Sequence, residues 1–253
     1  MVTTQAASPG AMTPRRERAR AATIEEIKAT ALELMREQRT TDIRFTDIAK
    51  GMGVTPPALY RYFDSRDDLL TVLITDAYDE LGARVRDAIA EATAASAEES
   101  RLWAAWVAAG QAYRRWASEA PERFALILGM PVPGYVADEE GPTTEAAKGA
   151  MSQLSALFFL AQEAGQLGRP LIRGVDPALA ECADKEHPEM GEVLDAEVFQ
   201  AMLQAWAGLH GFTSLEAYGH LDWLGPEARD ALFVSQLRLI ATCSGLPTDD
   251  ATA

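Results

Sequence analysis

Apolar residues recur at helical spacing through most of this chain, and no segment alternates apolar and polar residues as a β-strand does. Proline and glycine interrupt the pattern, leaving a link that runs through residue 143 and a longer loop over 168–191 with room for one helical turn. The chain therefore predicts an all-α fold. Long helices are expected over residues 66–93, 98–118, 144–165, 192–210 and 226–243, and a short one over 121–128.

Residues 46–63 predict two short helices around a tight turn. Thr46 is a good N-cap for the first helix, and Gly53 stands where that helix ends and the backbone needs a positive φ. Thr55 is suited to cap the second helix, and Pro56 fits its first turn, where an N–H would have no partner. The agreement of caps, turn and proline favours a helix–turn–helix unit.

The second of these short helices has an inward and an outward face. Leu59 and Phe63 are four residues apart and face inward, so aromatic and basic side chains remain on the outer surface. Such a surface on a short capped helix suits contacts to the phosphates and base edges of DNA. The alternative is an ordinary helical hairpin with a solvated face. The candidate DNA-binding residues are Thr46, Thr55, Pro56, Pro57, Tyr60, Arg61, Tyr62 and Arg66.

Two capping boxes mark further helix starts. Thr23 with Glu26 predicts the start of the first helix, and Ser65 with Asp68 predicts the start of the long helix that leads out of the DNA unit. Residues 1–19 are expected to form a disordered basic arm, because an uncharged stretch is followed closely by arginines. That arm would either lie along a DNA backbone or form a solvated helix start.

This N-terminal segment resembles the TetR family of bacterial transcriptional regulators over about residues 20–75. Tyr62 stands where that family usually has His, and Arg66 stands where it usually has Lys. The resemblance implies a three-helix head that binds DNA and a larger helical C-terminal body that binds a ligand and forms the dimer. Its carriers are Phe45, Thr46, Ile48, Ala49, Gly53, Val54, Leu59, Tyr60, Tyr62, Phe63, Ser65, Arg66 and Leu69.

The charge is distributed unevenly between the head and the body. The whole chain carries a net charge of −15, which alone argues against nucleic acid as a partner. Residues 1–66, however, hold 11 Lys/Arg against 8 Asp/Glu, a net of +3, whereas residues 67–253 hold 12 against 30, a net of −18. A basic head on an acidic body would confine DNA contact to the head.

The last two helices are apolar over more than one face, which indicates burial from two sides. They predict a four-helix dimer interface to which each protomer gives two helices, as the resemblance also implies. The alternative is that both helices pack wholly within one monomer. The candidate interface residues are Val198, Ala201, Ala205, Gly208, Phe233, Leu237 and Ile240.

Large aromatic and methionine side chains gather on the body helices and suit a pocket for an apolar or aromatic ligand. Most such residues in a helical protein are ordinary core. The run from Trp206 through His210 and Gly211 resembles the Trp-His-Gly pattern of one TetR subgroup, although Gly211 would also serve as a helix C-cap. The candidate pocket residues are Trp103, Trp106, Trp116, Met151, Phe158, Phe159 and Trp206.

Several classes of function are disfavoured by what the chain lacks. We place no Ser-His-Asp arrangement, glycine-rich phosphate loop or clustered acid–base set, so an enzyme is not expected. Cys182 and His187 share a loop, but two isolated ligands do not make a metal site, and we expect no cofactor. The absence of a leader-like or membrane-spanning stretch predicts a cytoplasmic protein.

We therefore expect a homodimeric repressor that binds a palindromic operator and releases it when a small, hydrophobic or aromatic molecule enters the body. The alternatives are a DNA-binding regulator without an effector, and an activator. The expected partners are double-stranded operator DNA, a second copy of the chain and the effector. The expected organisation is a basic arm over 1–19, the helix–turn–helix domain over 20–66, the ligand-binding and dimerisation domain over 67–247 and a disordered tail over 248–253.

Overall fold

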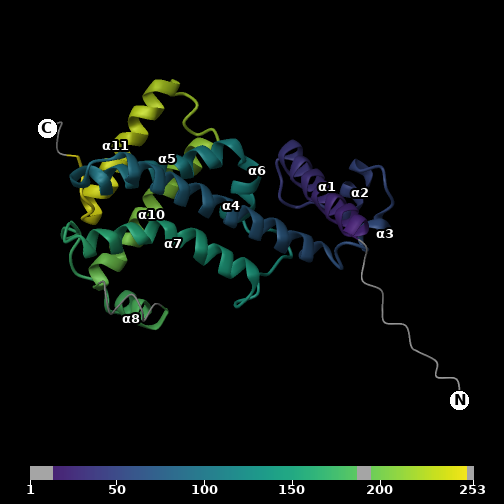
Figure 1. Ribbon diagram of the computed structural model, residues 1–253, viewed down its shortest axis with the longest axis horizontal. Coiled ribbons are helices and arrows are strands. Elements are labelled where there is room, and N and C mark those ends of the chain that lie inside the picture. The colour runs from purple at the N-terminus through teal and green to yellow at the C-terminus, as the bar shows by residue number, and fades with distance from the viewer. Residues whose placement is uncertain (1–13, 187–194, 250–253) are drawn as a thin grey trace, which may run out of the picture.

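The computed structural model describes residues 14–186 and 195–249, and every regular element within those residues is a helix (Figure 1). This confirms the all-α prediction. No helix among the described residues is both long and apolar enough to cross a membrane. The helices are α1 (Pro14–Gln38), α2 (Phe45–Gly51), α3 (Pro56–Leu59), α4 (Arg66–Ala95), the 3-10 turn η1 (Glu98–Ser100), α5 (Arg101–Glu119), α6 (Pro121–Leu128), α7 (Pro142–Glu163), α8 (Pro177–Glu186), α10 (Ala196–Ala217) and α11 (Pro226–Ser244).

Helices α1, α2 and α3 form a small head at one end of the molecule, and α4 runs from this head into the body (Figure 1). The head core is made by apolar side chains of all three helices together with the first two turns of α4. Its buried members include Phe45 and Phe63, and the largest of those that are almost completely buried are Ile27, Met35, Ile43, Ile48, Leu59 and Leu69. The three helices alone would bury too little apolar surface for a stable domain, and α4 supplies the additional buried residues.

The body packs the rest of α4 against α5 and α7, with α10 and α11 covering the far side of α5. Its core is aromatic, and the indole N–H of the buried Trp106 donates to the carbonyl of Leu237 at 2.9 Å. Gly82 of α4 lies against the backbone of Ala150 on α7, where an added Cβ would come within 3.1 Å of the Ala150 Cα. Close backbone approach therefore fixes the contact between α4 and α7.

Helix α6 contributes to both cores. Phe124 is buried among Tyr113 and Trp116 in the body, whereas Leu126, half a turn later, is buried in the head core. Figure 1 shows α6 lying between the body helices and α1. The loop after α6 adds Val132 to the head core. The head is thus joined to the body through α6 as well as through α4.

Most helix boundaries agree with the predicted ranges, and the exceptions are local. Helix α1 begins at Pro14, so Thr23 is not an N-cap; its hydroxyl donates to the Ala19 carbonyl one turn back, at 3.1 Å. The arginines at 15, 16, 18 and 20 therefore lie on a helix. Residues 1–13 and 250–253, within the predicted arm and tail, lie outside the described residues, as does His187.

Three further boundaries differ from the predicted ones. Helix α2 begins at Phe45, with Arg44 as N-cap, so Thr46 lies inside its first turn. Helix α8 occupies ten residues of the loop that was expected to hold one turn. Helix α10 continues six residues past Gly211, so this glycine is not a C-cap and His210 is not in the last turn. The Gly211 backbone stays helical because Phe212 and Thr213 are buried against the body.

The two capping boxes of the sequence provide a matched test of the fold. The Ser65 hydroxyl accepts the Asp68 amide at 3.1 Å at the start of α4, whereas Thr23 lies within α1. We predict that Ser65→Ala lowers the free energy of unfolding by about 1 kcal/mol. Thr23→Ala should leave it unchanged or raise it by a few tenths of a kcal/mol, about the difference in helix propensity. Urea denaturation at one protein concentration measures both, and equal losses would contradict this assignment.

Candidate nucleic-acid interface

The turn between α2 and α3 has the predicted backbone. Gly53 adopts a φ of 67°, and the Val54 amide donates to the Ala49 carbonyl at 2.9 Å, closing the end of α2. Thr55 takes the extended N-cap conformation without a side-chain cap bond, and Pro56 occupies the first turn of α3. After Leu59 the chain makes one more turn, because the Phe63 amide donates to the Leu59 carbonyl at 3.1 Å.

This turn exposes the predicted recognition residues. Tyr60 is 54% exposed and leans edge-on against the Phe45 ring of α2, with centroids 5.1 Å apart. Arg61 is exposed, and the half-buried Tyr62 lies beneath the guanidinium of Arg20, 5.6 Å from its ring centroid. Of the other candidates, Thr46, Thr55 and Pro57 are exposed and Pro56 is partly buried. The aromatic contacts hold the outward residues in fixed positions before any partner binds.

Two basic residues beside this surface were not among the sequence candidates. Arg44, the N-cap of α2, and Lys50, in its last turn, are both exposed. Neither they nor Arg61 has an ion pair with another described residue. Lys50 lies within the motif and Arg44 just before it, but the sequence argument considered chiefly the outer face of the second short helix, whereas the fold shows both cations exposed on the same small unit. Unpaired cations of this kind are available to neutralise phosphates.

Arg66, predicted as a DNA-contact residue, is engaged within the chain. Its guanidinium donates to the carbonyls of Ile43 at 2.7 Å and Pro133 at 3.2 Å, and to the Asp42 carboxylate at 2.8 Å. Each of its three nitrogens is therefore engaged within the chain. Arg66 ties the loop before α2 to the loop after α6, which makes it a junction residue of head and body.

The seven predicted pocket residues lie in or beside the body core, and none of them lines either of the two cavities described below. Trp106, Trp116 and Phe158 are buried, whereas Trp103, Met151 and Phe159 pack at the core margin. Trp206 is 37% exposed and stacks on His210, with ring centroids 5.8 Å apart.

His210 connects three body helices. Its Nδ1 lies 3.0 Å from the Tyr113 hydroxyl of α5, and its ring packs 5.7 Å from that of Phe124 on α6. Burial lowers the pKa of His210 below its ordinary value, so the imidazole is neutral at pH 7. It therefore contributes hydrogen bonding and ring packing, and it places no positive charge at a helix end.

The predicted dimer residues are committed to the interior of the chain. All except Gly208 are buried, and Gly208 faces Ile240, where an added Cβ would come within 3.2 Å of the Ile240 side chain. Contacts of α10 and α11 with each other and with α5 account for the burial of these residues. The exposed residues of the two helices include an uncharged stripe, which on α11 lies beside the exposed charged residues Glu227, Asp230 and Arg238. The stripe consists of Leu203, Gln204, Ala207 and Leu215 on α10, and of Ala228, Ala231, Leu232, Ser235, Leu239 and Thr242 on α11.

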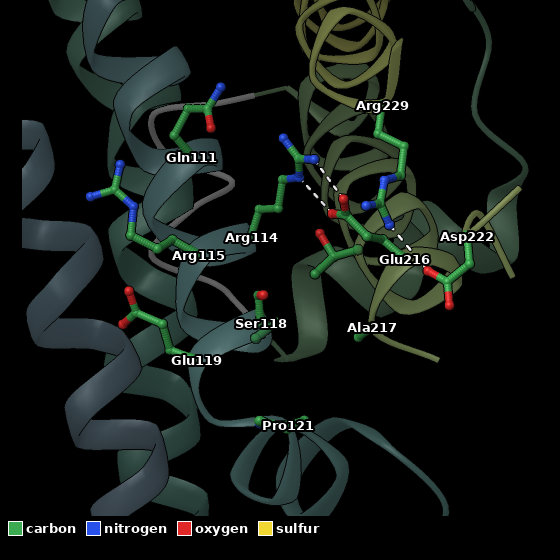
Figure 2. A pocket seen from close by; sticks show the side chains of 12 residues that line it. Gln111, Arg114, Arg115, Ser118, Glu119, Pro121, Glu216, Ala217, Asp222 and Arg229 are labelled. Carbon is green, nitrogen blue, oxygen red and sulfur yellow. Dashed lines mark hydrogen bonds and ion pairs between the residues drawn. The ribbon is translucent and has the colours of Figure 1, made fainter. Parts of the chain in front are cut away.

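We consider two cavities that open on the described surface. One, of about 340 Å³, lies between α1, α4 and α6, where Lys28 bonds the Asp76 carboxylate at 2.7 Å. The other, of about 550 Å³, lies between the C-terminal half of α5 and the helices α10 and α11 (Figure 2). The walls of this second cavity are polar, and Arg114 crosses from α5 to Glu216 of α10.

Comparison with known proteins matches both halves of the chain to one family. The model described as "Bacterial regulatory proteins, tetR family" matches residues 27–73, and the model described as "Tetracyclin repressor-like, C-terminal domain" matches residues 106–240. The HTH-type transcriptional regulator Rv1816 of Mycobacterium tuberculosis is 34% identical over 203 residues, covering 77% of this chain and 82% of the relative.

Solved structures share the architecture. The crystal structure of SCO4313 superposes with a TM-score of 0.65 at 33% identity, covering 90% of this chain and 98% of the other. The TetR family regulator PfmR of Thermus thermophilus superposes with a TM-score of 0.54 at 18% identity, covering 87% and 98%. The second similarity is one of fold alone.

Arg66 forms several hydrogen bonds within the chain and Arg61 is exposed, so we expect their substitutions to affect stability differently. We predict that Arg66→Ala lowers the free energy of unfolding by about 1–2 kcal/mol, because it removes charge-assisted bonds that join head to body. Arg61→Ala should change it by less than about 0.5 kcal/mol, as expected for an exposed residue without an ion pair. Urea titrations of the two variants measure this difference, and an Arg66→Ala variant as stable as the parent would refute the junction role.

Proposed function

The chain belongs to the TetR family of bacterial transcriptional regulators, and we propose that it is a homodimeric repressor that a small molecule releases from its operator. It is a DNA-binding regulator and not an enzyme. The observation that carries the proposal is the surface around α3. There Tyr60 and Arg61 point outward from a rigid turn beside the unpaired Arg44 and Lys50.

Different residues of this surface would contact the bases and the phosphates of DNA. The exposed Arg61 and Tyr60 would reach base edges in the major groove, whereas the exposed Arg44, Lys50 and Thr46 would contact phosphates. The strongly acidic body would repel DNA and so confine binding to the head. One head makes few base contacts, so specificity requires a second head on the same operator.

We propose that the second head comes from a dimer formed through the uncharged stripes of α10 and α11. Leu203, Leu215, Leu232 and Leu239 are each more than 40% exposed in the single chain. Both stripes border the line where Gly208 of α10 meets Gln236 of α11, so they form one continuous surface. An uncharged stripe of leucines and small residues on a molecule of net charge −15 is typical of a surface that another copy covers.

Release would act through the helices that belong to both cores. A molecule that moves α6 or tilts α4 must move the head as well, because Leu126 and Leu69 are buried in the head core. A coupling free energy of about 1–3 kcal/mol changes operator affinity by roughly five- to 150-fold.

We propose that an apolar effector enters the body among the seven predicted pocket residues. Trp103, Met151 and Phe159 pack at the margin of the core rather than in its centre, so their displacement would open a path toward Trp106. The contacts of His210 with Trp206, Tyr113 and Phe124 favour assignment to the Trp-His-Gly subgroup, since they give that pattern a structural role.

Arg61 gives the sharpest test of the DNA interface. We predict that Arg61→Ala weakens binding to DNA from immediately upstream of the protein's own gene by about ten- to 100-fold, the loss expected for one base-reading arginine. Sedimentation should show the dimer unchanged, because Arg61 lies in the head. Gel-shift titrations of the parent and of Arg86→Ala, an exposed arginine of α4, provide the comparison. Undiminished affinity in Arg61→Ala would remove this residue from recognition.

The proposed interface is tested by placing a charge in its centre. Leu239→Asp should convert the dimer to a monomer at micromolar concentration, because an unpaired buried carboxylate costs several kcal/mol. Val234→Asp is the matched control, since this residue lies on another side of α11 and is 37% exposed. Sedimentation equilibrium measures both variants. A dimeric Leu239→Asp protein, or a monomeric parent, would contradict the interface.

A further inference from the structure

We infer that the 550 Å³ cavity between α5, α10 and α11 is a binding site for a small molecule that carries carboxylate or phosphate oxygens (Figure 2). Its volume lies within the range of about 300–1,000 Å³ typical of small-molecule sites. The aromatic residues proposed to admit an apolar effector do not line it. The site and the chemistry of its ligand are therefore separate from those of the aromatic core.

A buried threonine on its wall has no hydrogen-bond partner. Thr213 is 1% exposed and lies inside α10, and its hydroxyl contacts no polar group among the described residues. A helical threonine ordinarily returns its hydroxyl to the carbonyl one turn back. Thr75 does so in this protein, donating to the Thr71 carbonyl at 2.8 Å. A buried hydroxyl left without a partner is costly, and an acceptor in the cavity would satisfy it.

The arginines of the wall add unused donors. Arg229 of α11 donates from Nη1 to Asp222 at 3.1 Å, while its buried Nε has no partner among the described residues. Arg115 of α5 is exposed and forms no ion pair with a described residue. Figure 2 shows Arg115 and Arg229 on opposite sides of Arg114. The unsatisfied groups thus come from three helices that line one cavity.

The carboxylates of the wall are already engaged. Glu119 accepts from Arg84 at 2.6 Å, Glu216 accepts two bonds from Arg114 at 2.5 Å, and Asp222 accepts from Arg229. Each of these carboxylates accepts from an arginine, whereas Arg115 forms no ion pair with a described residue. The donors of Arg115, of the Arg229 Nε and of the Thr213 hydroxyl favour a ligand that accepts hydrogen bonds, for which a carboxylate or phosphate is the best match.

The floor of the cavity is rigid. The Arg114 guanidinium holds Glu216 through two bonds, holds Asp230 through a third at 2.8 Å and stacks over the Phe233 ring at 4.7 Å. A site built on a fixed ion pair loses little conformational freedom when a ligand binds, which favours affinity.

A regulatory role for this site rests on the proposed function. Pro121, the first residue of α6, lines the cavity, and α6 carries Leu126 into the head core. None of the residues of the α10 and α11 stripes lines the cavity, so the proposed dimer leaves it open. A ligand there would contact the dimer helices and α6 together.

Calorimetric titration of the full chain with citrate, succinate and inorganic phosphate at constant ionic strength tests the inference. We expect saturable binding of at least one of these probes. Arg115→Ala and Thr213→Val should each weaken it, the former by about ten- to 100-fold, the loss expected when a charge-assisted bond is removed. Arg101→Ala, an exposed arginine of the same helix outside the cavity, should bind as the parent does.

The outcomes separate this inference from the proposed function. No saturable binding of any probe, or binding that Arg115→Ala and Thr213→Val leave unchanged, overturns the site. Binding that depends on both residues establishes it, whether or not the probe alters the affinity for DNA. Release of DNA by the bound probe, measured in the same buffer, would add the regulatory role.

Discussion

Helices α4 and α6 each belong to two hydrophobic cores, and the arrangement of the molecule depends on that sharing. Leu69 and Leu73 of α4 are buried in the head, while Leu81 and Val85 of the same helix are buried in the body. Close-packed interiors deform little, so the head cannot be reoriented without a movement of these helices. Arg66 reinforces the same junction from the surface by binding Ile43, Pro133 and Asp42.

Charged groups are distributed differently in the head and in the body. In the head, Arg44, Lys50 and Arg61 are left exposed without ion pairs among the described residues. In the body, Arg84 pairs with Glu119 and Arg114 pairs with Glu216, and acidic residues outnumber basic ones by 30 to 12 over residues 67–253. The net positive charge is therefore confined to the head, although the chain as a whole is acidic. The uncharged stripe of α10 and α11 lies apart from the basic residues of the head.

Local signals in the sequence predicted most of the helices correctly. Which residues lie on the surface could be known only from the way the helices pack. Ser65 and Gly53 could be assigned because a cap and a positive φ depend on neighbouring residues alone. Thr23 matched the same capping pattern as Ser65, but the residues before it are good helix formers and α1 simply continues. Ala205 and Trp206 of α10 are both apolar, and the packing of α10 against α11 and α5 decides which of the two is buried. The cavity escaped prediction because Arg115, Thr213 and Arg229 come from three separate helices.

In the proposed dimer, two heads fixed to one body read DNA together. Protection mapping of the purified protein on DNA from immediately upstream of its own gene tests this claim most directly. The predicted result is a protected palindrome whose two half-sites lie about 34 Å apart, one turn of the double helix, or a multiple of that distance. A folded, dimeric protein that protects a single isolated half-site, or gives no protection at moderate salt, would contradict it.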